Sequence, residues 1–116
     1  MSNVIRFPLG STLRHNLAEA QERKAETDRQ QSVVYHIYTE DKREAVGPLI
    51  RRYFPCATLY TATGIWHGET ERALVIEIVA DANALQSIVF LVGDIKAVLE
   101  QSAVLLAWWP ANSLLV

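Results

Sequence analysis

The sequence predicts an α+β protein built on one antiparallel sheet with two helices on one of its faces. Three observations lead to this class. Four short segments are rich in β-branched and aromatic residues, as strands are. Two segments between them repeat apolar residues at helical spacing. A hairpin over residues 57–80, with Gly64 and Gly68 near its turn, lies at the centre of the chain, and the other elements can pack against it.

The first strand and helix follow each other closely. Val33–Thr39 (VVYHIYT) is a strand in which neither face is plainly polar, which indicates a central position covered on both sides. Residues 42–54 carry an apolar stripe at helical spacing, and Asp41 is placed to cap that helix. Pro48 lies inside the stripe, so the helix either begins there or is kinked there, and Pro55 ends it.

The second half of the chain supplies the remaining strands and the second helix. The hairpin arms are Thr58–Ile65 and Ala73–Val79, and the helix is predicted over residues 84–101. Ala103–Trp109 (AVLLAWW) is the last strand, and Pro110 is predicted to stop it. The resulting order is strand, helix, strand, strand, helix, strand.

That order is the split βαβ, or ferredoxin-like, arrangement. Right-handed crossovers place the first and third strands at the centre of the sheet. We expect the ferredoxin-like domain to cover residues 32–116. Residues 1–31 are expected to add an extension with a helix from Ser11 or Thr12 to about Gln30. Its apolar stripe is thin, so it is either a solvated surface helix or an arm that binds a partner.

Length, charge and cysteine content narrow the class of function. The chain has 116 residues, which suits one domain, and a formal net charge of −2, which gives no electrostatic reason to expect nucleic acid as a partner. Its single cysteine, Cys56, builds no disulfide framework and fits a cytoplasmic location. No apolar stretch reaches ~18 residues, so neither a membrane span nor a membrane partner is expected.

The strands predict self-association. Two helices cover only one face of a sheet, yet both faces of Val33–Thr39, Ala73–Val79 and Ala103–Trp109 are largely apolar. Burying roughly 800 Å² on each partner is typical of a specific interface. We therefore expect a homo-oligomer with sheets packed face to face. The apolar residues 114–116 either add a short edge strand or cross to a neighbouring subunit.

A motif in the hairpin carries a resemblance to known proteins. The pattern is Phe54-Pro55-x-Ala57-Thr58-Leu59-x-x-Ala62-x-Gly64-x-Trp66-x-Gly68-x-x-Glu71-x-Ala73-Leu74-Val75-Ile76, with a later Gln101-x-Ala103-Val104-Leu105. It resembles a group of small bacterial and phage proteins of unknown function. The element order and the Trp-bearing hairpin are also loosely similar to the signal-transduction PII proteins and the copper-tolerance CutA proteins. That resemblance implies a ferredoxin-like trimer whose clefts between subunits bind small ligands, nucleotides in the PII case. The long modified loop of PII proteins is not found here.

Candidate ligand-binding residues gather in and near the hairpin. Trp66 could stack on a planar ligand or anchor the hairpin on a neighbouring subunit. Gly64 and Gly68 either let the backbone approach a ligand or provide a bulge or turn. His67, Glu69 and Glu71 suit a metal by residue type, although a fourth ligand is lacking and a solvated hairpin tip is the simpler interpretation. Arg72 could instead pair with Glu71.

Other polar residues have weaker signals. Arg43, Arg51 and Arg52 offer guanidinium forks that suit phosphate, or else form a solvated helix face. His36 and Glu77 lie on strands predicted to be neighbours, and a buried carboxylate needs a partner, which either His36 or an arginine of another subunit can supply. They are interpreted as a structural pair, with acid–base catalysis as the alternative. No Ser/His/Asp, Walker or GxGxxG motif occurs, and no cofactor, metal or catalytic residue is assigned.

These observations support three hypotheses. The first is a non-enzymatic oligomer, trimeric by resemblance, that binds a small anionic ligand such as a nucleotide at subunit clefts. The second is a protein-interaction module, encoded by a phage or mobile element, whose N-terminal helix contacts a host protein. The third is an enzyme that uses His36 or His67 with Glu77 or Glu71.

Overall fold

The computed structural model describes residues 16, 19 and 30–116. The elements over 30–116 are β1 (Gln30–Glu40), α2 (Arg43–Arg51), β2 (Thr58–Trp66), β3 (Glu69–Ala80), the short 3-10 turn η1 (Ala82–Ala84), α3 (Leu85–Val98) and β4 (Leu105–Ser113). Residues 31–111 form one compact unit. The predicted N-terminal helix, Ser11 or Thr12 to about Gln30, lies almost wholly outside the described residues, and Gln30 itself begins β1.

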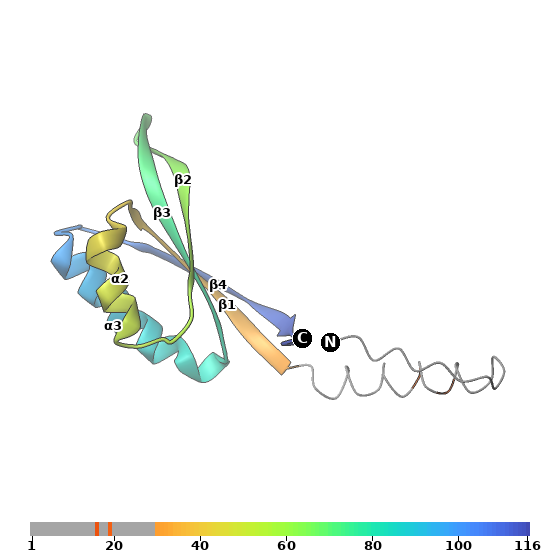
Figure 1. The fold of residues 1–116 in the computed structure, drawn as a ribbon. Coiled ribbons are helices and arrows are strands. Elements are labelled where there is room, and N and C mark those ends of the chain that lie inside the picture. The colour runs from red at the N-terminus through yellow and green to blue at the C-terminus, as the bar shows by residue number, and fades with distance from the viewer. Residues whose placement is uncertain (1–15, 17–18, 20–29) are drawn as a thin grey trace. The chain divides into compact units, whose positions relative to one another are not determined.

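The strands form one sheet in the order β2-β3-β1-β4. β3 pairs antiparallel with both β1 and β2. The first and third strands are therefore central, as predicted, and α2 and α3 lie on the same side of the sheet (Figure 1). The ferredoxin-like βαββαβ fold predicted from the sequence is confirmed.

The register of the central strands separates the two faces of the sheet. Ile37 lies opposite Ile76 and faces the helices, whereas the next pair, His36 opposite Glu77, faces away from them. We call the side away from the helices the open face. Its members on the four strands are Val34, His36, Tyr38, Val75, Glu77, Val79, Tyr60 and Trp109.

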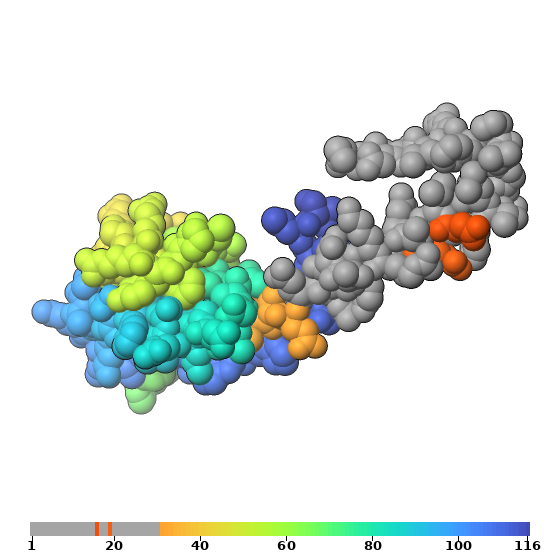
Figure 2. Space-filling model, turned by 90° about the horizontal axis from the view of Figure 1, so that it is seen from below, coloured from red at the N-terminus to blue at the C-terminus, as the bar shows by residue number. Residues whose placement is uncertain are grey.

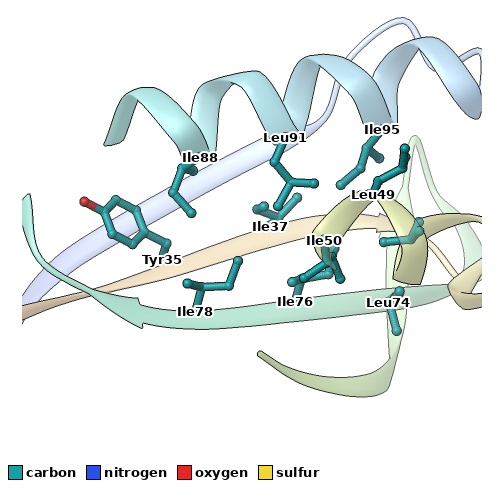
Figure 3. Close-up of a cluster of buried hydrophobic side chains, with 11 residues drawn as sticks. Tyr35, Ile37, Leu49, Ile50, Leu74, Ile76, Ile78, Ile88, Leu91 and Ile95 are labelled. Carbon is teal, nitrogen blue, oxygen red and sulfur yellow. The ribbon is translucent and has the colours of Figure 1, made fainter. Parts of the chain in front are cut away.

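The core fills the space between the sheet and the helices (Figure 3). Ile88, Leu91 and Ile95 repeat at helical spacing on α3 and are fully buried against the sheet. The strands contribute alternate residues to this core, namely Tyr35, Ile37, Leu74, Ile76 and Ile78, and α2 contributes Val46, Leu49 and Ile50. This side of the sheet therefore needs no further partner.

Helix α2 differs from its prediction at both ends. It begins at Arg43 and continues through Pro48, so the interpretation that it starts at Pro48 is wrong. The proline removes one hydrogen bond, while burial of Leu49 and Ile50 holds the turn on the sheet. Its end at Arg51 comes before the predicted residue 54. Asp41 makes no capping hydrogen bond, and Lys42 occupies the cap position instead.

Strand β4 shows a second correction. It runs from Leu105 to Ser113 and passes through Pro110, which was predicted to stop it. β4 is at the edge of the sheet. An edge strand tolerates proline where the missing N–H would point outward, so Pro110 does not end the ladder. Residues 114–116 are not in a strand, so the prediction that they add a short edge strand is wrong.

The helices pack closely over the sheet. In Figure 2 the end of α2 and the segment after it, in yellow-green, lie against α3. The Tyr53 hydroxyl donates a hydrogen bond of 2.6 Å to Asp94 on α3. Among residues 30–116, neither α-helix has the length and apolarity that a membrane span requires.

Candidate functional site

The β2–β3 hairpin extends beyond the part of the sheet that the helices cover (Figure 1). Within the core, β3 is buried on its helix side at Leu74 and Ile76, but residues 69–72 are all exposed. Near the tip, Ile65 is 75% exposed and Trp66 is 65% exposed. Because side chains alternate along a strand, each face of the projecting hairpin exposes one large apolar side chain.

The tip is a tight two-residue turn. Trp66 lies opposite Glu69, so His67 and Gly68 form the connection. Both have positive φ, 49° at His67 and 80° at Gly68, which a type I′ hairpin turn requires. Gly68 therefore has a conformational reason to be glycine. At Gly64 a Cβ would meet its nearest atoms at 3.7 Å, an ordinary contact, so the single chain does not require glycine there.

A charged groove lies at the base of this hairpin. It is lined by the start of α2 and the loop before it together with β3, through Glu40, Asp41, Lys42, Arg43, Glu44, Glu71 and Arg72. Asp41 accepts hydrogen bonds from Arg72 at 3.0 Å and from Arg43 at 3.4 Å. Arg43 also donates to the Thr61 hydroxyl on β2 at 2.7 Å. These bonds tie the β1–α2 loop to both arms of the hairpin.

The structure brings some of the predicted site residues together. Glu71 and Arg72 both line the groove, and Gly64 pairs with Glu71 across the hairpin. Trp66, His67 and Gly68 follow at the tip. The rings of Trp66 and His67 meet edge to face with centroids 5.0 Å apart.

Arg51 and Arg52 are separated from this group. The groove is lined by Arg43 at the start of α2, and Arg51 lies at the other end of the helix, about 12 Å along its axis. Arg52 is 3.8 Å from Asp94 on α3. These two arginines therefore do not line the groove of their own chain.

A second polar cluster lies on the open face. His36 Nε2 is 2.8 Å from Glu77 Oε1, and His36 Nδ1 is 3.1 Å from the Tyr38 hydroxyl. The predicted His36–Glu77 pair is therefore confirmed. The His36 ring also meets Trp109 of β4 edge to face, with centroids 4.7 Å apart, and Tyr60 of β2 at 6.3 Å. All four strands thus contribute to this cluster.

The open face is apolar around that cluster. Val75 is buried between its cross-strand neighbours Tyr38 and Tyr60, while Val79 is 53% exposed. Burial, and then the negative charges of Glu77 and Tyr38, raise the pKa of Tyr60, so its hydroxyl stays protonated at neutral pH. The face therefore presents aromatic and aliphatic groups around one carboxylate.

Sequence reasoning missed two features of these clusters. Asp41 was interpreted as a helix cap, but its carboxylate holds Arg43 and Arg72 at the groove. Tyr60 and Trp109 were not associated with His36, because strand register and not local pattern brings them together. Within the described part of the chain, no three His, Cys, Asp or Glu side chains gather as metal ligands do, and the pattern His67, Glu69, Glu71 forms no such set.

The fold has relatives among solved structures. No family model matches the chain, and no curated protein is similar to it in sequence. The nitrogen regulatory PII-like protein CPII from Thiomonas intermedia K12, bound to ADP, AMP and bicarbonate, superimposes with a TM-score of 0.58 at 11% identity. That match covers 73% of this chain and 94% of the CPII chain.

Two further structures share the fold. A phage SAM lyase in complex with S-methyl-5′-thioadenosine has a TM-score of 0.55 at 14% identity, and covers 72% of this chain and 90% of its own. A DUF3240 family protein from Shewanella baltica OS155 has a TM-score of 0.53 at 12% identity, with 70% and 89% covered. These likenesses define the class: the chain has a PII-like, ferredoxin-like fold.

Proposed function

We propose that this protein is an oligomeric binding protein for a small anionic ligand that carries an adenine nucleoside. Trp66 and the charged groove lie on opposite faces of the hairpin, so Trp66 of one copy and the groove of a second copy together form the cleft for the ligand. The observation that carries the proposal is the projecting hairpin, which exposes Trp66 on one face and carries Arg72 into a groove with Arg43 on the other.

The two parts of the region suit the two parts of such a ligand. An exposed indole offers a flat surface on which a base can stack, an interaction of about 1–3 kcal/mol. Guanidinium groups of Arg72 and Arg43 now donate to Asp41, and they offer forked donors for phosphate or carboxylate oxygens when a ligand replaces that carboxylate. The groove also carries the carboxylates of Glu40, Glu44 and Glu71, so the ligand must approach along the arginines. Arg72 is 79% exposed at its side chain, so it can turn from Asp41 to a ligand at little cost.

The fold relatives support the choice of ligand class. CPII is bound to ADP and AMP, and the phage lyase holds S-methyl-5′-thioadenosine. All three molecules contain adenosine or its 5′-thio analogue. At these identities the comparison concerns the fold, so the ligand of this chain is inferred from the residues at the hairpin and groove.

Self-association is part of the proposal. The open face is apolar and the helices do not cover it, so a second copy is the simplest cover, with a trimer favoured by the PII-like architecture. The hairpin tip, exposed in the single chain, then reaches a neighbouring copy. Ligand binding and self-association are expected to favour each other, because both involve this hairpin.

A substitution at Trp66 tests the proposal. Titration of the wild type with ADP, AMP, S-methyl-5′-thioadenosine and cyclic nucleotides should raise its melting temperature for at least one ligand. For that ligand, Trp66→Ala should raise the dissociation constant about 5- to 150-fold, since one stacking interaction is lost. Calorimetry measures this change directly.

Trp108 provides the matched control. It is 52% exposed on β4, outside the hairpin and the groove, so Trp108→Ala removes the same side chain without touching the proposed site. The Trp108→Ala protein should bind as the wild type does. Equal losses in both variants, or no thermal shift with any ligand for a confirmed oligomer, would contradict ligand binding at the hairpin.

A second candidate function is an enzyme that acts on an adenosine-bearing substrate. Two observations favour it: the fold likeness to a phage SAM lyase, and the hydrogen-bonded His36–Glu77 pair, which could exchange a proton. The other predicted combination is less favoured, because the described structure places His67 in the turn and Glu71 at the groove.

Incubation with S-adenosylmethionine tests the enzyme hypothesis. A lyase that uses this pair as a base would remove a proton from the carbon beside the breaking C–S bond, so that the C–H electron pair forms a C=C bond and the C–S electron pair leaves with sulfur. The products are S-methyl-5′-thioadenosine and an unsaturated four-carbon amino acid, which chromatography separates from the substrate. If the pair exchanges the proton, Glu77→Gln should reduce turnover at least about 100-fold, the lower range for a general acid or base. Binding without product, or product release that is unchanged in Glu77→Gln, would exclude this role.

A further inference from the structure

The His36–Glu77 pair lies at the middle of the open face. His36 and Glu77 are directly opposite each other on the two central strands, β1 and β3. His36 is only 9% exposed as a residue, and the Glu77 side chain is 34% exposed, so solvent reaches the pair mainly through the carboxylate. Covering the open face would remove that remaining access.

The groups that face the pair cannot neutralise it. Tyr38 comes from β1, Tyr60 from β2 and Trp109 from β4, and none of these carries a positive charge. Over residues 30–116, no lysine or arginine forms an ion pair with Glu77. Neutral histidine beside an ionised carboxylate therefore leaves one net negative charge in this cluster.

Binding of one proton removes this net negative charge. If the pair binds one proton, an imidazolium faces a carboxylate at 2.8 Å and the net charge is zero. Burying an unpaired charge costs far more free energy than burying a hydrogen-bonded ion pair. Histidine is the side chain type whose charge ordinarily changes between about pH 5 and 8, so association is best compared between pH 6 and pH 8.

We infer that association of two or more copies through the open face binds a proton at each His36–Glu77 pair, so that the protein assembles more tightly as pH falls. This inference rests on the self-association proposed above. By linkage, the assembled state holds more protons than the free chains, and its stability is lost as pH rises. One proton per chain sets the limit at about a tenfold change in association per chain and pH unit.

Sedimentation of the full chain at pH 6 and pH 8 tests the inference. The wild type should dissociate at lower concentration at pH 6, with a dissociation constant at least about tenfold smaller than at pH 8. Glu77→Gln keeps the shape and one hydrogen bond but removes the charge. It should associate at pH 8 as tightly as the wild type does at pH 6, with little dependence on pH.

Two other variants complete the test. His36→Gln cannot take up the proton and leaves Glu77 charged, so it should associate weakly at both pH values. Glu100→Gln removes one negative charge in the same way, but at an exposed position two residues after the end of α3. It should keep the pH dependence of association that the wild type has. Thermal unfolding confirms that each variant folds.

The outcomes separate this inference from the assembly on which it rests. An oligomer whose association does not change between pH 6 and pH 8, or a Glu77→Gln protein that keeps the wild-type dependence, overturns the proton linkage alone. A wild-type chain that sediments as a single 13.0 kDa particle at both pH values overturns the proposed assembly as well.

Discussion

The substitution Val79→Lys should convert the assembled protein into single chains of 13.0 kDa, as measured by light scattering. Val79 lies on the open face of β3 and is 53% exposed in the single chain, so lysine there should leave the fold intact. In an interface the same ammonium group would be buried without a partner, which costs several kcal/mol. We therefore expect the dissociation constant to rise at least about 100-fold.

An exposed valine on α3 provides the control. Val89 is 51% exposed on the helix layer, on the opposite side of the sheet from Val79. Val89→Lys makes the same chemical change at nearly the same exposure and should leave the mass of the assembly unchanged. Dissociation by Val89→Lys together with an intact assembly in Val79→Lys would place the interface on the helices and contradict the proposal.

The largest expected effect on stability comes from Ile76→Ala. Ile76 is fully buried on central strand β3, directly opposite Ile37 and next to Leu59 of β2. Truncation removes apolar contacts and leaves a cavity between the sheet and the helices, at a cost of about 2–5 kcal/mol. Because domains are typically stable by only about 5–15 kcal/mol, urea unfolding should show a large shift of the midpoint.

Two comparisons check the origin of this loss. Ile76→Val keeps most of the volume and should cost about 0.5–1.5 kcal/mol. Val79→Ala, on the same strand but on the open face, should cost less than Ile76→Ala when measured at concentrations where the chain is dissociated. Equal losses at Ile76 and Val79 would mean that the helix layer does not cover the face that the structure assigns to it.

Much of the fold could be predicted because period and order are local properties of the chain. The stripe Ile88, Leu91, Ile95 and the alternation Leu74, Ile76, Ile78 each indicate one element and its buried side. Once the elements are in order, right-handed crossovers leave little choice of topology, which is why the central positions of β1 and β3 could be expected.

The residues at which helices and strands begin and end were harder to predict from the sequence, because tertiary packing decides them. Pro48 and Pro110 both look like breaks in the sequence, yet one lies inside α2 and the other inside β4. Packing of Leu49 and Ile50 on the sheet outweighs the hydrogen bond that Pro48 loses, and an edge position accommodates Pro110. Neither compensation is visible in a local pattern.

The candidate site could be predicted only in part. The hairpin with Trp66 is one continuous segment, so its residues could be grouped from sequence. The groove joins Asp41 to Arg72, and the open-face cluster joins His36 to Trp109, over long separations in the chain. The contact between Asp41 and Arg72 depends on how the loop after β1 packs against β3. The contact between His36 and Trp109 depends on the register of the strands across the sheet.

Pro110 also has a consequence for the size that the proposed assembly can reach. A strand at the margin of a sheet can template another chain through its free backbone donors and acceptors, which leads to open-ended fibrils. Pro110 lies within β4, a marginal strand, and offers no N–H to an incoming strand. In the proposed assembly this proline would disfavour the addition of a strand at that margin, and so favour a closed particle of finite size over a filament.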